Sequence, residues 1–111
     1  MGILNKTKRY ALFVQLEHRD DAKNYISETG ATIHTTIDSI DEHSASEIIF
    51  EATRKQIKEL KRSIYDRTLI DNVCFKYAGD GLYKRIWTKS VPIYTLPPID
   101  KFKRDFGYEV Q

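Results

Sequence analysis

The first part of the chain alternates between apolar and polar positions and predicts a β-strand over residues 8–16. Tyr10 and Leu12 fall on one face of this strand, and Ala11 and Phe13 fall on the other. Apolar side chains on both faces are typical of a strand in the middle of a sheet. We therefore expect a central strand that is covered on both sides.

A short helix is expected next, because Asp20 and Asp21 favour a helix N-terminus and Gly30 stands where the helix should stop. Residues 31–37 alternate again and are rich in β-branched side chains. This pattern predicts a second strand, with one face in solvent.

Residues 46–52 fit two structures. They alternate as a strand does, yet the capping-box sequence of Ser44–Glu47 also suits the start of a long helix. A second capping-box sequence, Thr53–Gln56, stands where a helix would begin after a strand. We prefer a strand followed by a helix, because Phe50 would lie off the apolar face of a continuous helix.

The remaining pattern predicts a helix over residues 54–66 and a β-hairpin over residues 73–88. The turn of the hairpin is Ala78-Gly79-Asp80-Gly81, whose glycines allow positive φ angles. The C-terminal tail contains three prolines and a sequence compatible with a helical turn around residues 100–106.

The order of these elements is β-α-β-β-α-β with one further strand from the hairpin. It predicts an α+β fold: a ferredoxin-like βαββαβ sandwich, with an antiparallel sheet, two helices on one face and an extra C-terminal hairpin strand. The 111 residues fit a single domain, residues 1–111, and 41% of them are hydrophobic, which is enough for a core.

Composition and charge add the expected location and a hint about partners. No apolar run is long enough to span a membrane, and the single cysteine, Cys74, has no partner for an internal disulfide. We therefore expect a cytoplasmic protein. The charge is unevenly distributed, since residues 17–51 are mainly acidic whereas residues 52–111 carry most of the Lys and Arg. Such asymmetry indicates a charged partner.

Catalytic and metal-binding motifs are not evident. His18, His34 and His43 are far apart in the sequence, and none has a second His or Cys at ligand spacing. Cys74 has no context that would activate it as a nucleophile. We therefore expect a non-enzymatic binding protein with no metal and no cofactor.

The hairpin suggests a surface for nucleic acid. If Tyr77 pairs with Leu82 across the turn, the aromatic and basic side chains of one face lie together, and they resemble a platform for single-stranded RNA or DNA. The basic row of the preceding helix would extend this platform, and so would Lys101, Lys103 and Arg104 of the tail. The candidate nucleic-acid-binding residues are Lys55, Lys58, Arg62, Lys76, Tyr83, Arg85 and Trp87.

Two alternatives remain open. The acidic region 17–51 could instead bind a basic nucleic-acid-binding protein, as small inhibitors and adaptors of phages and mobile elements do. The candidate residues for that interaction are Asp38, Asp41, Glu42, Glu47 and Glu51. Self-association through an exposed edge strand or aromatic face would give a homo-oligomer.

The third interpretation is enzymatic. A helix followed by a basic hairpin that ends Leu82-Tyr83-Lys84-Arg85-Ile86-Trp87 resembles small ribonuclease toxins of the RelE kind. This resemblance would give Tyr83, Lys84 and Arg85 roles in phosphate stabilisation and acid–base chemistry.

Overall fold

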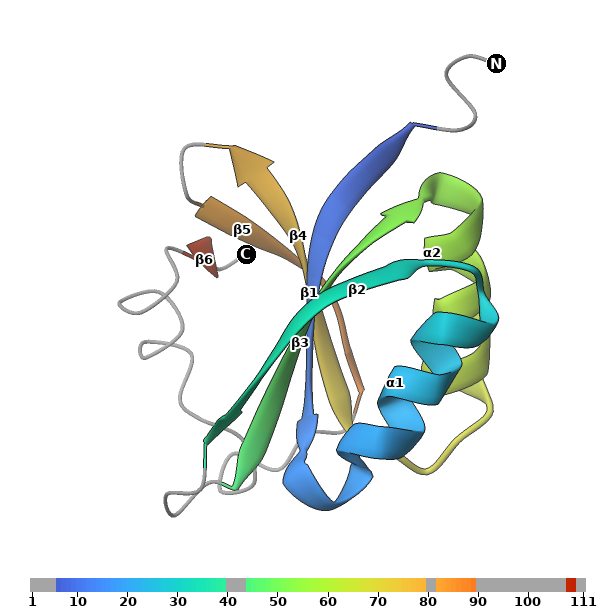
Figure 1. Cartoon of the computed structure of the whole chain (residues 1–111), viewed down its shortest axis with the longest axis vertical. Coiled ribbons are helices and arrows are strands. Elements are labelled where there is room, and N and C mark those ends of the chain that lie inside the picture. The colour runs from blue at the N-terminus through green and yellow to red at the C-terminus, as the bar shows by residue number, and fades with distance from the viewer. Residues whose placement is uncertain (1–5, 40–43, 80–81, 90–107, 110–111) are drawn as a thin grey trace.

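A computed structural model describes residues 6–39, 44–79, 82–89 and 108–109 (Figure 1). The helical elements are α1 (Arg19–Glu28), preceded by a 3₁₀ turn at Leu16–His18, and α2 (Arg54–Leu60), which continues as a π-helical segment at Lys61–Asp66. The strands are β1 (Thr7–Gln15), β2 (Thr32–Ser39), β3 (Ala45–Thr53), β4 (Asn72–Gly79), β5 (Leu82–Lys89) and β6 (Tyr108–Glu109).

All six strands form one sheet in the order β2-β3-β1-β4-β5-β6. Strands β1 to β5 each pair antiparallel with their neighbours among these five, and the two-residue β6 pairs parallel to β5. Because β1 and β2 are both antiparallel to the strand between them, the unit β1-α1-β2 is a split βαβ motif. The predicted α+β fold is confirmed: an antiparallel sheet with two helices, extended beyond β4 by the hairpin strand β5.

The ambiguous residues 46–52 belong to strand β3, and helix α2 follows directly. The second capping box forms as its sequence suggests. The Thr53 hydroxyl accepts a hydrogen bond from the backbone N–H of Gln56 at 3.2 Å, and the Gln56 side chain accepts one from the backbone N–H of Thr53 at 2.8 Å. These two bonds satisfy N–H groups that a helix start leaves open, which fixes the strand-to-helix junction at Thr53.

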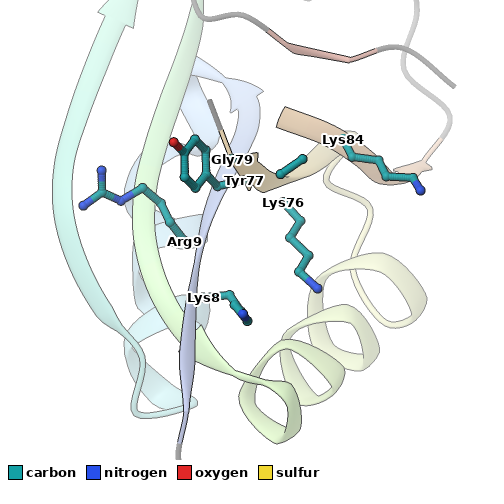
Figure 2. A pocket seen from close by; sticks show the side chains of 7 residues that line it. Lys8, Arg9, Lys76, Tyr77, Gly79 and Lys84 are labelled. Atoms are coloured by element: carbon teal, nitrogen blue, oxygen red, sulfur yellow. The ribbon is translucent and has the colours of Figure 1, made fainter. Parts of the chain in front are cut away.

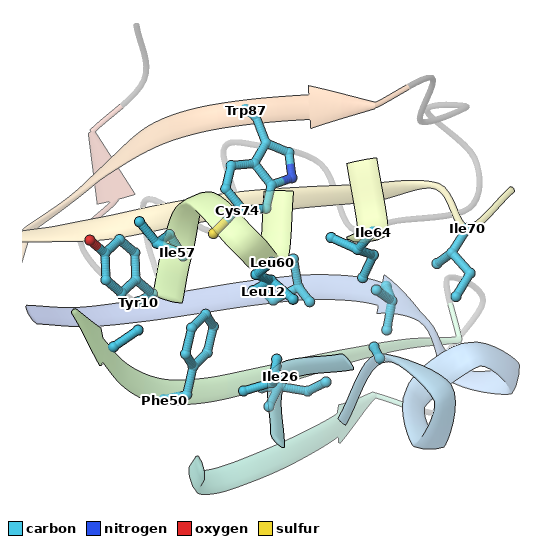
Figure 3. Packing of buried hydrophobic residues seen from close by; sticks show 14 residues of the cluster. Tyr10, Leu12, Ile26, Phe50, Ile57, Leu60, Ile64, Ile70, Cys74 and Trp87 are labelled. Atoms are coloured by element: carbon cyan, nitrogen blue, oxygen red, sulfur yellow. The ribbon is translucent and has the colours of Figure 1, made fainter. Parts of the chain in front are cut away.

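The main hydrophobic core lies between the sheet and the two helices (Figure 3). Strand β1 contributes Tyr10, Leu12 and Val14, and β3 contributes Phe50, whose ring stacks on that of Tyr10 at a centroid distance of 5.6 Å. The helices contribute their apolar stripes, which include Ala22, Ile26, Ile57, Leu60 and Ile64. Ile57, Leu60 and Ile64, spaced i, i+3 and i+7, are thus the face that α2 and its π-helical continuation bury.

Trp87 is part of this core, which corrects the prediction that it lies on an exposed platform. Its side chain is only 7% exposed and is directed from β5 toward Cys74 (Figure 3). The indole N–H donates a 2.5 Å hydrogen bond to Oδ1 of the fully buried Asn72, and the Tyr65 ring meets the indole edge-on at 6.4 Å. Trp87 therefore packs and hydrogen-bonds inside the protein, and its ring cannot stack on a base.

The error concerns which side of the sheet is covered, because Trp87 lies with Cys74 on the side that the helices cover. A β-bulge separates Trp87 from Arg85. In the observed register Cys74 pairs with Trp87, but the next residue, Phe75, pairs with Arg85. One extra residue on β5 reverses the alternation, so Trp87 and Arg85 face opposite sides of the sheet although they are two residues apart. The turn differs too, because Tyr77 pairs with Tyr83 and Leu82 pairs with Gly79.

The sheet face opposite the helices is not an open surface along its centre. Ala11, Phe13, Val73 and Phe75 point to that side and are between 0% and 5% exposed. Phe13 and Phe75 meet edge-to-face at 5.7 Å. The buried stretch of β1 is thus covered on both faces, as its pattern predicted, and the centre of this face is not available for base stacking.

The tail prediction around residues 100–106 lies outside the described residues, as do Lys101, Lys103 and Arg104. Strand β6 has no counterpart in the sequence-based expectation. None of the helices in the described part of the chain is long and apolar enough to cross a membrane.

The position of Trp87 gives a stability prediction. Trp87→Ala should lower the free energy of unfolding by about 3–5 kcal/mol, because it removes a large core side chain and leaves the buried Asn72 carbonyl oxygen without its donor. Leu69→Ala is the matched control: Leu69 is 99% exposed, and its truncation should change stability by less than about 0.5 kcal/mol. Urea unfolding followed by circular dichroism measures both, and equal small effects would place Trp87 at the surface.

Candidate functional site

A basic pocket opens where the first residues of β1 meet the β4–β5 hairpin (Figure 2). Its volume is about 500 Å³. The residues that line it are Lys8, Arg9, Lys76, Tyr77, Ala78, Gly79 and Lys84. This set of four cationic side chains, one tyrosine and two small residues is called the basic pocket below.

The sheet register brings these cations together. Tyr10 pairs with Lys76 across β1 and β4, and Lys76 pairs with Lys84 across β4 and β5. Lys8 lies two residues before Tyr10 and so faces the same side of the sheet. The intervening Arg9 faces the other side, as Tyr77 does, and Figure 2 shows these two side chains directed away from Lys8 and Lys76.

Gly79 sets the shape of the pocket at the end of β4. Its φ angle is +96°, a conformation that side-chain-bearing residues rarely adopt. It lies at the second register shift of the hairpin, where Tyr77 pairs with Tyr83 but Gly79 pairs with Leu82. The chain therefore curls at the pocket wall without placing a side chain there.

The charge of the basic pocket is only partly balanced. Arg9 lies 3.7 Å from Glu51, measured between Nη2 and Oε2. For Lys8, Lys76 and Lys84, no carboxylate of the described residues lies within ion-pair distance. Three ammonium groups around one concave surface give it a positive potential, which attracts anions.

The positive surface continues toward helix α2. Burial raises the pKa of the Tyr10 phenol, and the nearby charge of Arg54 opposes that shift, which places Arg54 within electrostatic reach of Tyr10. Tyr10 is the register partner of the pocket residue Lys76. The predicted helix row is exposed as expected, with Lys55 and Lys58 on α2 and Arg62 on the π-helical segment that continues it. These three residues together with Arg54 are called the α2 row.

The residues of the predicted hairpin platform do not lie together on one surface. Lys76 lines the basic pocket, but Trp87 is in the core and Arg85 is half-buried on the other side of the sheet. The side chain of Tyr83 lies outside the described residues. Sequence reasoning missed Lys8 and Arg9, although a basic pair just before the buried part of a strand was a visible signal. Lys84 was not among the predicted nucleic-acid-binding residues, although it pairs with Lys76 and faces the same side.

The acidic candidates do not form one free surface. Asp38 accepts hydrogen bonds from Arg19 at 2.5 Å and from Ser46 at 2.8 Å, and the Ser46 hydroxyl and the Arg19 guanidinium hold the pKa of Asp38 below its usual value. Glu47 is only 3% exposed. Glu51 is engaged by neighbouring strands, as described below, and Asp41 and Glu42 lie outside the described residues.

The residues suggested by the ribonuclease resemblance are separated as well. Lys84 pairs with Lys76 on the helix side of the sheet, whereas Arg85 pairs with Phe75 and faces the other side. These two cations therefore do not converge on one phosphate from within the hairpin.

The described residues contain no candidate metal site and no activated thiol. Within these residues, no group of three His, Cys, Asp or Glu side chains is placed to hold a metal ion. Cys74 is fully buried, and burial raises the pKa of its thiol well above the ordinary value, so the reactive thiolate is disfavoured. The comparisons with known proteins add no family, since no family model and no curated protein sequence matches this chain.

The basic pocket predicts stabilisation by a polyanion. Tripolyphosphate that binds the folded state at Lys8, Lys76 and Lys84 should raise the Tm by about 5 °C at concentrations well above its Kd. Sodium chloride at the same ionic strength is the control and should not do so. The double variant Lys76→Gln/Lys84→Gln should lose most of the rise in a thermal scan, and an undiminished rise would show that the anion binds elsewhere.

Proposed function

We propose that the protein binds single-stranded RNA or DNA, and that it does so mainly by contacting phosphates in the basic pocket. The observation that carries this proposal is the convergence of Lys8, Lys76 and Lys84 on one concave surface without a balancing carboxylate among the described residues. Burying or crowding like charges costs free energy, and an anionic ligand relieves that cost. A nucleic-acid backbone supplies such charges at regular intervals.

The dimensions and lining of the basic pocket suit a nucleotide unit. A volume of about 500 Å³ is typical of sites for small ligands, which include single nucleotides. Tyr77 lines the same pocket and is 39% exposed, so its ring is accessible to a base or a sugar. Arg9 lies on the same side of the sheet as Tyr77, so it would hold a phosphate next to a base that the ring contacts.

The α2 row supports a longer contact. Lys55, Lys58 and Arg62 recur at positions i, i+3 and i+7 of the helix, so they form a line along its solvent face. Arg54, at the start of α2, lies within electrostatic reach of Tyr10, whose register partner Lys76 lines the basic pocket. A strand that places one phosphate in the basic pocket can therefore continue along the α2 row.

This mode of binding differs from a stacking platform on the sheet. The aromatic rings at the centre of the sheet, Phe13, Phe75 and Trp87, are buried and serve packing. Phosphate contacts dominate in the mode proposed here, and such contacts do not distinguish base sequence. We therefore propose a binding protein with weak sequence preference, located in the cytoplasm where such ligands occur.

Binding to an oligonucleotide tests the proposal. A labelled single-stranded oligonucleotide of about 15 nucleotides should bind with an affinity that falls steeply with salt, with a slope of log K against log [salt] of about −3 if four phosphates are contacted. Fluorescence anisotropy of the label measures it. Trp87 fluorescence is a poor reporter here, because its ring is inside the core.

A matched pair of variants localises the contact. Lys84→Glu should weaken binding by about tenfold at low salt, because it puts a negative charge in the basic pocket. Arg67→Glu makes the same change in net charge at an exposed residue that precedes the first residue of β4, at the end of the strand away from the basic pocket. This variant should change the affinity only slightly. Equal losses would mean that only the net charge matters. No binding by the wild-type protein at any salt concentration would contradict the proposed function and leave a protein partner as the better hypothesis.

A further inference from the structure

Glu51 connects three strands beside the basic pocket. Its Oε2 atom lies 2.7 Å from Nε2 of His34 on β2 and 3.7 Å from Nη2 of Arg9 on β1. Its Oε1 atom accepts a hydrogen bond of 3.1 Å from the Thr7 hydroxyl. Arg9 is also one of the four cations that line the basic pocket. One carboxylate oxygen is thus shared by a histidine and by a pocket arginine.

The register explains why these side chains meet. Glu51 pairs directly with Arg9 on one side and with Thr32 on the other. The pairing of β2 with β3 shifts between Ile33 and Thr35, and His34 occupies that irregularity. Thr32 faces the same side as its partner Glu51, and His34, two residues further on, continues on that side. Alternation along β2 therefore brings a titratable ring to the ion pair.

Imidazole is the side chain that commonly changes charge near neutral pH, and His34 supplies the imidazole of this group. Hydrogen bonds from His34 and Thr7 hold the pKa of Glu51 below its usual value, so its carboxylate stays ionised well below neutral pH. The guanidinium of Arg9 is charged throughout. At pH 8 the charges of Arg9 and Glu51 cancel, and protonation of His34 at lower pH gives the group a net positive charge.

Other ionisable side chains lie on the same face of the sheet as Glu51. On the same face, β3 contributes Glu47, β4 contributes Tyr77 and β5 contributes Arg85. Helix α1, which also packs on β2, lies on the opposite face with Arg19 and Lys23. Except for His34, none of these side chains ordinarily changes charge between pH 5.5 and 8.

We infer that Glu51 competes with phosphate for Arg9, and that protonation of His34 frees Arg9 to contact phosphate at the basic pocket, so that the protein binds single-stranded nucleic acid more tightly at mildly acidic than at slightly alkaline pH. This inference rests on the proposed function. It makes Glu51 a residue that limits affinity and makes His34 the group that sets its pH dependence.

A purely structural ion pair between strands would behave differently. In that case removal of the Glu51 charge would loosen the strands and leave phosphate affinity unchanged or weaker. Competition instead predicts a gain of affinity when the carboxylate is neutralised, and a gain of this kind is not expected from lost packing. The Glu51→Gln variant keeps the size and hydrogen-bonding capacity of the side chain, so it isolates the charge.

The test is the Kd of an oligothymidylate of about 15 nucleotides without terminal phosphates, measured at about pH 5.5 and about pH 8 at constant ionic strength. Thymine and phosphodiester groups do not titrate in this interval. The wild-type protein should bind about threefold more tightly at the lower pH. Glu51→Gln should bind about threefold more tightly than wild type at pH 8. In an Arg9→Gln background the same change should gain less, because the competed cation is absent.

His34→Gln should match the wild type at pH 8 and lose its pH dependence, whereas the control His18→Gln, at a histidine that faces Glu17 near α1, should retain it. If the oligothymidylate binds but Glu51→Gln gives no gain, or if His34→Gln keeps the full pH dependence, the inference is wrong and the proposed function stands. If wild type and variants all fail to bind at either pH, both are wrong. Thermal unfolding of each variant checks that it is folded.

Discussion

The structure depends on strand β1 being buried on both of its faces. Tyr10 to Val14 are at most 4% exposed, so neither face of this stretch can hold a charge. Charged side chains therefore appear only at its start, where Lys8 and Arg9 project to opposite faces. Strand β4 follows the same rule, since Asn72 to Phe75 are buried and Lys76 is the first basic residue after them. Because Tyr10 pairs with Lys76, the two boundaries between buried and charged residues coincide, and the basic pocket forms there.

Much of the fold could be predicted from the sequence because it follows from local patterns. The alternation in β1 and β2, the capping box at Thr53 and the apolar stripe of α2 each depend on residues a few positions apart. The faces of β5 could not be predicted, because two register shifts in its pairing with β4 decide them, one between Cys74 and Phe75 and one between Tyr77 and Gly79. Only part of the candidate site could be predicted, because the rest depends on strand register. Local patterns identified Lys76 and the helix residues Lys55, Lys58 and Arg62, whereas Lys8 joins them only through the register of two strands distant in sequence.

The uneven charge of the sequence has a different meaning in the folded protein. The acidic region supplies partners within the molecule: Asp38 holds Arg19 and Ser46, and Glu51 holds Arg9 and His34. These contacts tie β2 to α1 and β3 on one face, and β1 to β2 and β3 on the other. Exposed ion pairs of this kind contribute little to stability, so their main effect is on which cations remain available. Lys8, Lys76 and Lys84, which have no acidic partner among the described residues, lie together at one end of the sheet.

The central claim, that this end of the sheet is where a nucleic-acid backbone binds, is tested most directly by mapping contacts in solution. Amide chemical-shift changes in a ¹⁵N-labelled sample titrated with oligothymidylate would report each residue separately. The account predicts the largest changes at Lys8, Arg9, Lys76 to Gly79 and Lys84, with smaller changes along the first turns of α2. Changes centred on α1 or on the outer edge of β2, or a spectrum that does not change at low salt, would contradict it.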